Sequence, residues 1–83
     1  LDNAVSLESA RAKGIRSPVA GLADILIAPN VEAGNMLVKA ITYFAGGKMA
    51  GVVVGGQRPL IVASRSDPHE TKLASIALGV LLS

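Results

Sequence analysis

The chain has 83 residues and a net charge of +2, with 51% hydrophobic, 17% charged and 2% aromatic residues, which suits one small domain or a piece of a larger one. In an ordinary soluble domain about one quarter of the residues are charged. Because this chain has fewer, we expect part of its surface to be covered by the rest of its own polypeptide or by another subunit. The scattered lysines and arginines speak against nucleic acid as a partner, the lack of a run of roughly 20 apolar residues speaks against a membrane span, and the absence of cysteine excludes a thiolate zinc site and a cysteine nucleophile.

The first half of the chain is predicted to hold a helix, a loop and a short strand. Residues 3–13 form the helix, with Asp2 placed as its N-cap and Gly14 as the stop after its last turn. Residues 14–21 are rich in turn formers and are expected to be a loop. The apolar run at 24–28, closed by a proline, predicts a buried strand.

The second half is predicted to hold two helices with two strands between them. Residues 31–45 form the first helix, which an asparagine caps and two glycines end. The β-branched run at 50–54 and the run at 60–63 are the strands, and a glycine-rich turn joins them. The last helix covers about 68–82. This order of elements predicts an α/β fold built around a mixed sheet.

The junction between the last strand and the last helix, residues 60–72, concentrates the chemistry. Asp67 fits the N-cap of the helix, Pro68 its first position and Glu70 its third. This spacing is that of a capping box with a preset first turn. In open α/β sheets, ligands bind beyond the carboxyl ends of the strands, and a helix N-terminus at that edge favours phosphate.

The side chains at this junction suit an anion. Arg65 carries a planar fork that matches phosphate oxygens, and Ser64 and Ser66 add hydroxyl groups. The alternative interpretation is that the serines and Asp67 only cap the helix while Arg65 is a solvated surface residue. Local sequence leaves both interpretations open.

A second strand-to-helix junction at 29–39 has similar features. Gly34 lies inside a predicted helix, at a cost of roughly 1 kcal/mol relative to alanine, which indicates close approach by a backbone or a ligand. Asn35 and Lys39 are four residues apart and share a helix face. Tight helix packing and a surface lysine are the alternative explanation. No group of acidic or histidine residues has metal-ligand spacing, so no metal site is expected.

Several blocks, taken in order, resemble the end of phosphate butyryltransferases and, less closely, phosphate acetyltransferases. The resemblance extends over nearly all 83 residues, and it is the succession of motifs that makes it specific. The blocks are DNAVS at 2–6, KGIRSPVAGLADIL at 13–26, PNVEAGNMLVKAITYFAGGKMAGVVVGG at 29–56 and PLIVASRSDPHETKLASIAL at 59–78.

The resemblance implies an enzyme that moves an acyl group between coenzyme A and inorganic phosphate. It implies two α/β domains with a three-layer mixed sheet, in a fold similar to isocitrate and isopropylmalate dehydrogenases, and a cleft between the domains. Residues 1–83 would then be the C-terminal fragment of a phosphate acyltransferase domain, inactive by itself. The family further implies a homo-oligomer without a metal or a permanently bound cofactor, for which coenzyme A is a substrate. The absence of cysteine fits a cytoplasmic location.

The resemblance also carries over to residues. Ser64 and Arg65 match a catalytic and phosphate-binding pair of the acetyltransferase branch. That branch has an aspartate seven positions after the serine, where this chain has Thr71, and an arginine where it has Tyr43. The Tyr43-Phe44 pair and the spacing after Arg65 favour the butyryl branch. Asp67 and Glu70 are the nearby carboxylates, and Asp67 is the candidate acid or base, with helix capping as its alternative role.

The remaining candidates for substrate binding in the cleft are Gly34, Asn35, Lys39 and Ser66. Two other classes of protein are alternatives to an acyltransferase. One is a dehydrogenase of the same fold, which would need a metal-binding aspartate cluster, and the other is a non-catalytic, oligomerising fragment. The sequence does not identify the length of the acyl chain.

Overall fold

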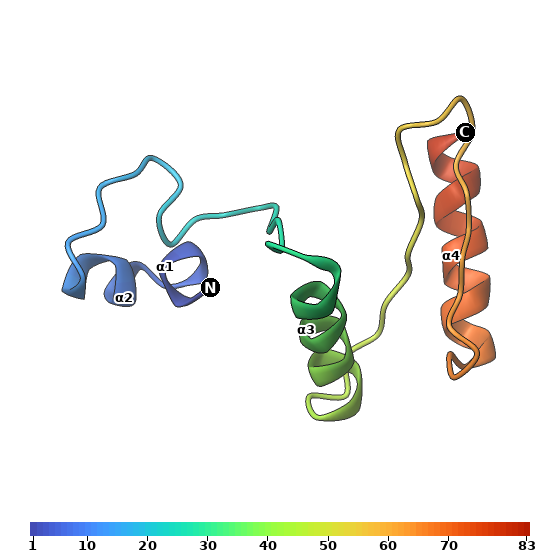
Figure 1. Cartoon of the computed structure of the whole chain (residues 1–83), viewed down its shortest axis with the longest axis horizontal. Helices are drawn as coiled ribbons and strands as arrows, with labels where there is room; N and C mark the ends of the chain where they lie inside the picture. The colour runs from blue at the N-terminus through green and yellow to red at the C-terminus, as the bar shows by residue number, and fades with distance from the viewer. The chain divides into compact units, whose positions relative to one another are not determined.

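Four helices make up the regular structure of residues 1–83 in the computed structural model (Figure 1). The chain falls into two units, Leu1–Gly34 and Asn35–Ser83. None of the helices is long and apolar enough to cross a membrane. The helices are α1 (Asp2–Val5), α2 (Leu7–Ala12), α3 (Val31–Tyr43) and α4 (His69–Leu82).

The first predicted helix is interrupted at Ser6, so the expectation of one continuous helix over 3–13 is wrong. Ser6 has an extended backbone, and its hydroxyl accepts a hydrogen bond from the Ser9 amide (3.2 Å), which makes it the N-cap of α2. Asp2 does not cap a helix. It lies in the first turn of α1, where the hydrogen bond from Lys13 Nζ (2.7 Å) lowers the pKa of its carboxyl. Gly14 ends α2 with φ +66°, which confirms the predicted stop.

The loop that follows α2 folds back onto α1. The Gly21 amide donates to the Asn3 carbonyl (2.7 Å), and the Ala23 amide donates to the Ala4 carbonyl (3.1 Å). Gly21 has φ +74°, and a Cβ atom at this position would lie 2.6 Å from the backbone nitrogen of Leu7. Only glycine meets both conditions, since the left-handed backbone and the close approach each exclude a side chain.

The apolar run at 24–28 forms no strand, and Ile25 and Ile27 are 77% and 87% exposed. A strand needs the backbone of a neighbouring strand for its amide and carbonyl groups, and unit Leu1–Gly34 contains none. The prediction of a buried strand therefore fails within residues 1–83.

Helix α3 agrees with its prediction to within two residues. The side chain of Asn30 accepts from the Ala33 amide (2.8 Å), which confirms the predicted cap. After Tyr43 the chain turns through Gly46, at φ +67°, and the Gly47 amide returns to the Ile41 carbonyl (2.9 Å). Helices often end in this way, with a glycine in the left-handed conformation followed by an amide that donates a hydrogen bond to a carbonyl of the last turn.

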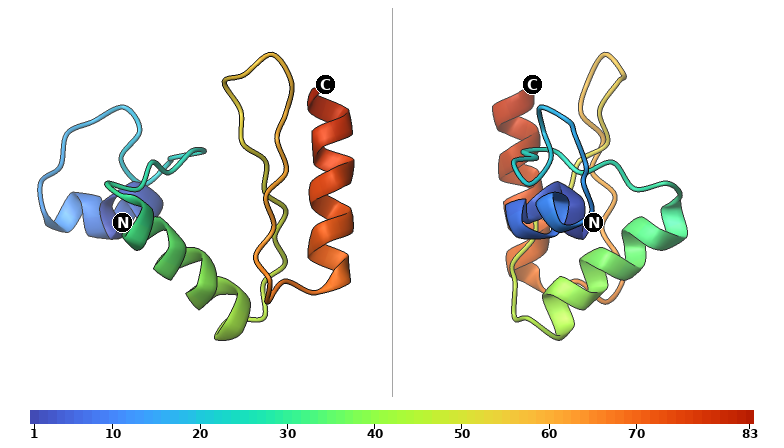
Figure 2. Two further views of the ribbon diagram at one scale, coloured as in Figure 1. Left: turned by 45° about the vertical axis from the view of Figure 1, so that its right-hand side comes forward. Right: turned by 90° about the vertical axis from the view of Figure 1, so that its left-hand side faces the viewer.

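Residues 50–54 and 60–63 run antiparallel to each other and lie alongside α4 (Figure 2). Only Val53 and Leu60 form a bridge, with amide-to-carbonyl distances of 2.7 and 3.1 Å. The two predicted strands are thus reduced to one paired position, because a two-stranded ribbon by itself is marginally stable. The larger mixed sheet stays a prediction.

Two small residues one turn apart let α4 approach the 50–63 hairpin closely. Ser75 is buried, and its hydroxyl accepts from the Gly51 amide (3.0 Å) and donates to the Thr71 carbonyl (2.8 Å). Gly79 is also buried, and a Cβ there would lie 2.9 Å from Ile61 Cδ1. The hairpin therefore packs against one face of α4. This contact sets the direction in which the chain enters the turn that follows residue 63.

Much apolar surface stays open, as the composition suggests. Ala10 is the one hydrophobic side chain that is buried, while Phe44 is 91% and Leu81 81% exposed. Single exposed apolar residues are common on proteins, but so many large ones indicate surfaces that another part of a protein covers.

The two left-handed glycines of the first unit provide a matched pair of substitutions. Gly14→Ala meets no atom within 4 Å and should cost only the left-handed backbone penalty, about 1 kcal/mol. Gly21→Ala must in addition displace the Leu7 backbone and should lower the free energy of unfolding by about 3 kcal/mol or more. Urea denaturation of the protein that carries this chain measures both, and equal costs would show that the loop does not lie against α2.

Candidate functional site

A four-residue turn, Ser64–Asp67, connects the hairpin to α4. The Asp67 amide donates to the Ser64 carbonyl (3.1 Å), and Asp67 Oδ2 accepts from the Ser64 amide (2.9 Å). Asp67 thus closes the turn through both its backbone and its side chain. Arg65 and Ser66 occupy the two central positions and are exposed.

This geometry corrects the predicted capping box. Helix α4 begins at His69, and Pro68 takes the N-cap position, from which no side-chain hydrogen bond reaches the helix. The Asp67 carboxylate points back to the Ser64 amide instead of forward into the first turn. Because no side chain caps α4, its first backbone N–H groups are available to an anion, and the helix dipole adds partial positive charge there.

The two serines of the turn are linked to each other. Ser64 Oγ and Ser66 Oγ are 3.0 Å apart, and the Ser66 amide donates to Ser64 Oγ (3.3 Å). One of the two hydroxyls therefore donates to the other. Both groups are exposed, so each keeps hydrogen-bonding capacity for a substrate.

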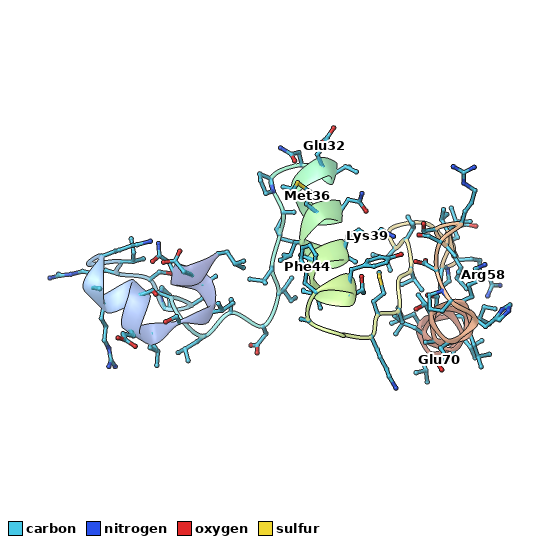
Figure 3. All side chains as sticks on the ribbon, turned by 90° about the horizontal axis from the view of Figure 1, so that it is seen from below. Glu32, Met36, Lys39, Phe44, Arg58 and Glu70 are labelled. Atoms are coloured by element: carbon cyan, nitrogen blue, oxygen red, sulfur yellow. The ribbon has the colours of Figure 1, made fainter.

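Lys39 extends from α3 to this turn (Figure 3). Its Nζ donates to Ser66 Oγ (3.4 Å) and lies 3.8 Å from Asp67 Oδ1 and 5.8 Å from the centre of the Tyr43 ring. The Asp67 side chain is only 14% exposed and that of Lys39 34%. The Lys39 ammonium therefore lies next to the serine pair, although Lys39 and Ser66 are 27 residues apart in the sequence.

A cavity of about 200 Å³ adjoins the turn. Tyr43 and Thr71, the two positions at which the sequence departs from the acetyltransferase branch, both contribute to its wall. The sequence alone did not point to Thr42 or Met49, although Thr42 follows Lys39 by three residues and so shares its helix face. The lining residues are Thr42, Tyr43, Met49, Ser66, Asp67, Pro68 and Thr71.

The other sequence candidates have different surroundings. The Arg65 side chain makes no hydrogen bond or ion pair and is free to meet a ligand. A Cβ at Gly34 would lie 3.2 Å from Ala28 Cβ, so close packing within its own unit accounts for this glycine. Asn35 is exposed, and no hydrogen bond joins its side chain to the Ser64–Asp67 turn. The structure thus gathers Ser64, Ser66, Asp67 and Lys39 but adds nothing to the case for Gly34 or Asn35.

The chain is similar to known proteins over almost its whole length. The sequence profile described as phosphate acetyl/butaryl transferase matches residues 1–80. A phosphate acetyltransferase of Thermotoga maritima is 52% identical over all 83 residues, and a phosphate butyryltransferase of Clostridium beijerinckii is 49% identical over the same length. In each case the match covers 28% of the relative.

A solved structure is also similar. The crystal structure of a branched-chain phosphotransacylase from Enterococcus faecalis V583 matches 95% of this chain and 29% of its own, with a TM-score of 0.80 and 38% sequence identity. The chain spans less than a third of the length of these relatives. Because the profile covers almost every residue, the chain belongs to the phosphate acetyl/butaryl transferase family.

Proposed function

We propose that the protein carrying this chain transfers an acyl group between coenzyme A and inorganic phosphate, giving an acyl phosphate and free coenzyme A. The observation that supports this most is the Ser64–Asp67 turn, which places an unpaired Arg65 and two hydroxyls at the uncapped start of α4, with Lys39 beside them. Such an arrangement suits a phosphate that must be held and kept oriented.

The reaction is a direct displacement at the thioester carbonyl. A phosphate oxygen forms a bond to the carbonyl carbon, the carbon–sulfur bond breaks, and coenzyme A leaves as a thiolate that then takes up a proton. Arg65 holds the phosphoryl group in position for attack. Ser64 donates a hydrogen bond to the charge that develops on the carbonyl oxygen or on the leaving sulfur.

Lys39 and Ser66 complete the phosphate-binding part of this proposal. The Lys39 ammonium lies within reach of Ser66 and partly offsets the charge of Asp67, which would otherwise repel phosphate. Gly34 and Asn35, on the same helix, stay candidate cleft residues on the strength of the sequence resemblance alone.

Butyryl is the acyl group we propose, because Tyr43 and Thr71 replace the charged residues of the acetyltransferase branch. The relatives include both acetyl and butyryl transferases, so this choice rests on those two positions. We further propose that the complete protein is a cytoplasmic homo-oligomer, and that the 50–54 and 60–63 segments belong to a three-layer mixed sheet in a two-domain fold. Residues 1–83 match only 29% of the E. faecalis phosphotransacylase chain, so we expect them to be inactive alone.

The activity itself is tested with the full-length protein that carries this chain. Butyryl-CoA together with phosphate should release free thiol, and omission of phosphate should abolish the release because phosphate is the attacking nucleophile. A thiol-reactive dye measures the rate. No thiol release from any acyl-CoA, together with reduction of a nicotinamide cofactor on a hydroxy acid, would instead identify a dehydrogenase of the same fold.

Arg65→Ala in the full-length protein should lower kcat/KM by roughly tenfold to a few hundredfold, since a charge-assisted bidentate contact is worth about 1.5–3 kcal/mol. The loss should be largest when phosphate is the varied substrate, and Arg65→Lys should restore only part because an ammonium lacks the fork. Arg58→Ala is the matched control, since Arg58 lies exposed at the far end of the hairpin. If both alanine variants had similar, near-normal kinetics, Arg65 would not be part of the phosphate site.

Substitution of Asp67 separates a turn-holding role from acid–base catalysis. Asp67→Asn keeps an oxygen that can accept from the Ser64 amide, so kcat/KM should stay within a few-fold and the pH–rate profile should keep its shape. Asp67→Ala removes the acceptor and should cost roughly tenfold. A loss of about a hundredfold or more in the asparagine variant, with disappearance of one limb of the pH profile, would show that Asp67 exchanges a proton with the substrate.

A further inference from the structure

The cavity next to the Ser64–Asp67 turn differs in character from the turn itself. Tyr43, Met49 and Pro68 bring an aromatic ring, a thioether and a pyrrolidine ring to its wall, and two threonines bring methyl groups. No lysine or arginine lines it, and its one ionised side chain is the Asp67 carboxylate. Lys39 does not line the cavity, but its ammonium lies 3.4 Å from Ser66 Oγ and 3.8 Å from Asp67 Oδ1 at the edge, where it partly offsets the Asp67 charge. Most of the wall is carbon, which suits an uncharged chain better than a phosphate.

The size of the cavity limits what it can hold. An apolar cavity of about 150 Å³ takes up a six-carbon ring. Sites for drug-sized ligands begin at roughly 300 Å³. At about 200 Å³, this cavity has room for a short chain of four to six carbons.

The position of the cavity connects it to the proposed reaction. Ser66 and Asp67 belong both to the cavity wall and to the turn that holds Ser64 and Arg65. A carbonyl group bound at the serine hydroxyls would therefore have its hydrocarbon chain next to Tyr43 and Met49. Methionine adapts its shape to irregular apolar groups more readily than a branched side chain does.

We infer that this cavity binds the hydrocarbon part of the acyl group, and that Met49 and Tyr43 set the length of chain that is accepted. The inference rests on the proposed acyl transfer and extends it by assigning the residues that select the substrate. Burying one methylene group is worth roughly a factor of four in kcat/KM, and discrimination in enzyme pockets often exceeds tenfold per methylene.

The test compares acetyl-, butyryl- and hexanoyl-CoA as substrates of the full-length protein by thiol release. Met49→Ala lengthens the cavity and should raise the hexanoyl-to-butyryl ratio of kcat/KM about tenfold. Met49→Phe shortens it and should lower the butyryl-to-acetyl ratio by a similar factor. Tyr43→Ala enlarges the cavity from another wall, and because Tyr43 is 66% exposed this substitution should leave the fold intact. It should therefore also favour hexanoyl-CoA.

Met36→Ala is the matched control, since Met36 is a methionine of α3 that is 75% exposed and does not line the cavity. Its chain-length ratios should equal those of the unsubstituted protein. Active Met49 and Tyr43 variants with unchanged ratios would overturn the acyl-chain assignment and leave the proposed transferase activity standing. An unsubstituted protein that releases no thiol from any of the three substrates would overturn both.

Discussion

The carboxylate of Asp67 holds the Ser64–Asp67 turn together, and the proposed site depends on this contact. Oδ2 accepts from the Ser64 amide and does not cap α4, so the first N–H groups of the helix stay open. The same contact leaves Arg65 at the exposed centre of the turn. A carboxylate bonded to a backbone amide is a strong, charge-assisted acceptor, so one side chain sets both the shape of the turn and its electrostatics.

The position of the turn follows from how α4 and the hairpin pack. Ser75 and Gly79 are small enough for the hairpin backbone to approach the helix, and the Gly51 amide is bonded to the Ser75 hydroxyl. The hairpin is therefore anchored along α4, and its second branch leads directly into Ser64. Lys39 then joins α3 to the turn through Ser66 and Asp67, so three separate segments of the sequence meet at one place.

Phosphate binding and acyl binding, as proposed, use neighbouring but chemically different surfaces. The turn offers a guanidinium, hydroxyls and helix amides, while the adjoining cavity offers rings, methyl groups and a thioether. The two reactants of an acyl transfer differ in the same way, one being a compact anion and the other a short hydrocarbon chain on a carbonyl. A shared boundary at Ser66 and Asp67 would bring the phosphate oxygen and the carbonyl carbon together, which is the positioning on which a direct displacement depends.

The sequence by itself determined the helices α3 and α4, the stop at Gly14, the cap at Asn30 and the candidate turn, because capping, glycine stops and apolar spacing are local signals. It also located the family, through motifs spread over the whole chain. Tertiary structure alone decided that Asp67 bonds to Ser64 instead of capping α4, that Met49 and Thr42 lie at the site, and that Lys39, already a candidate from the sequence, contacts Ser66 and Asp67. These are contacts between segments up to 27 residues apart, and residue spacing carries no information about them. The strand predictions failed for a related reason: a strand exists only where a second backbone pairs with it, and residues 1–83 supply that partner only between Val53 and Leu60.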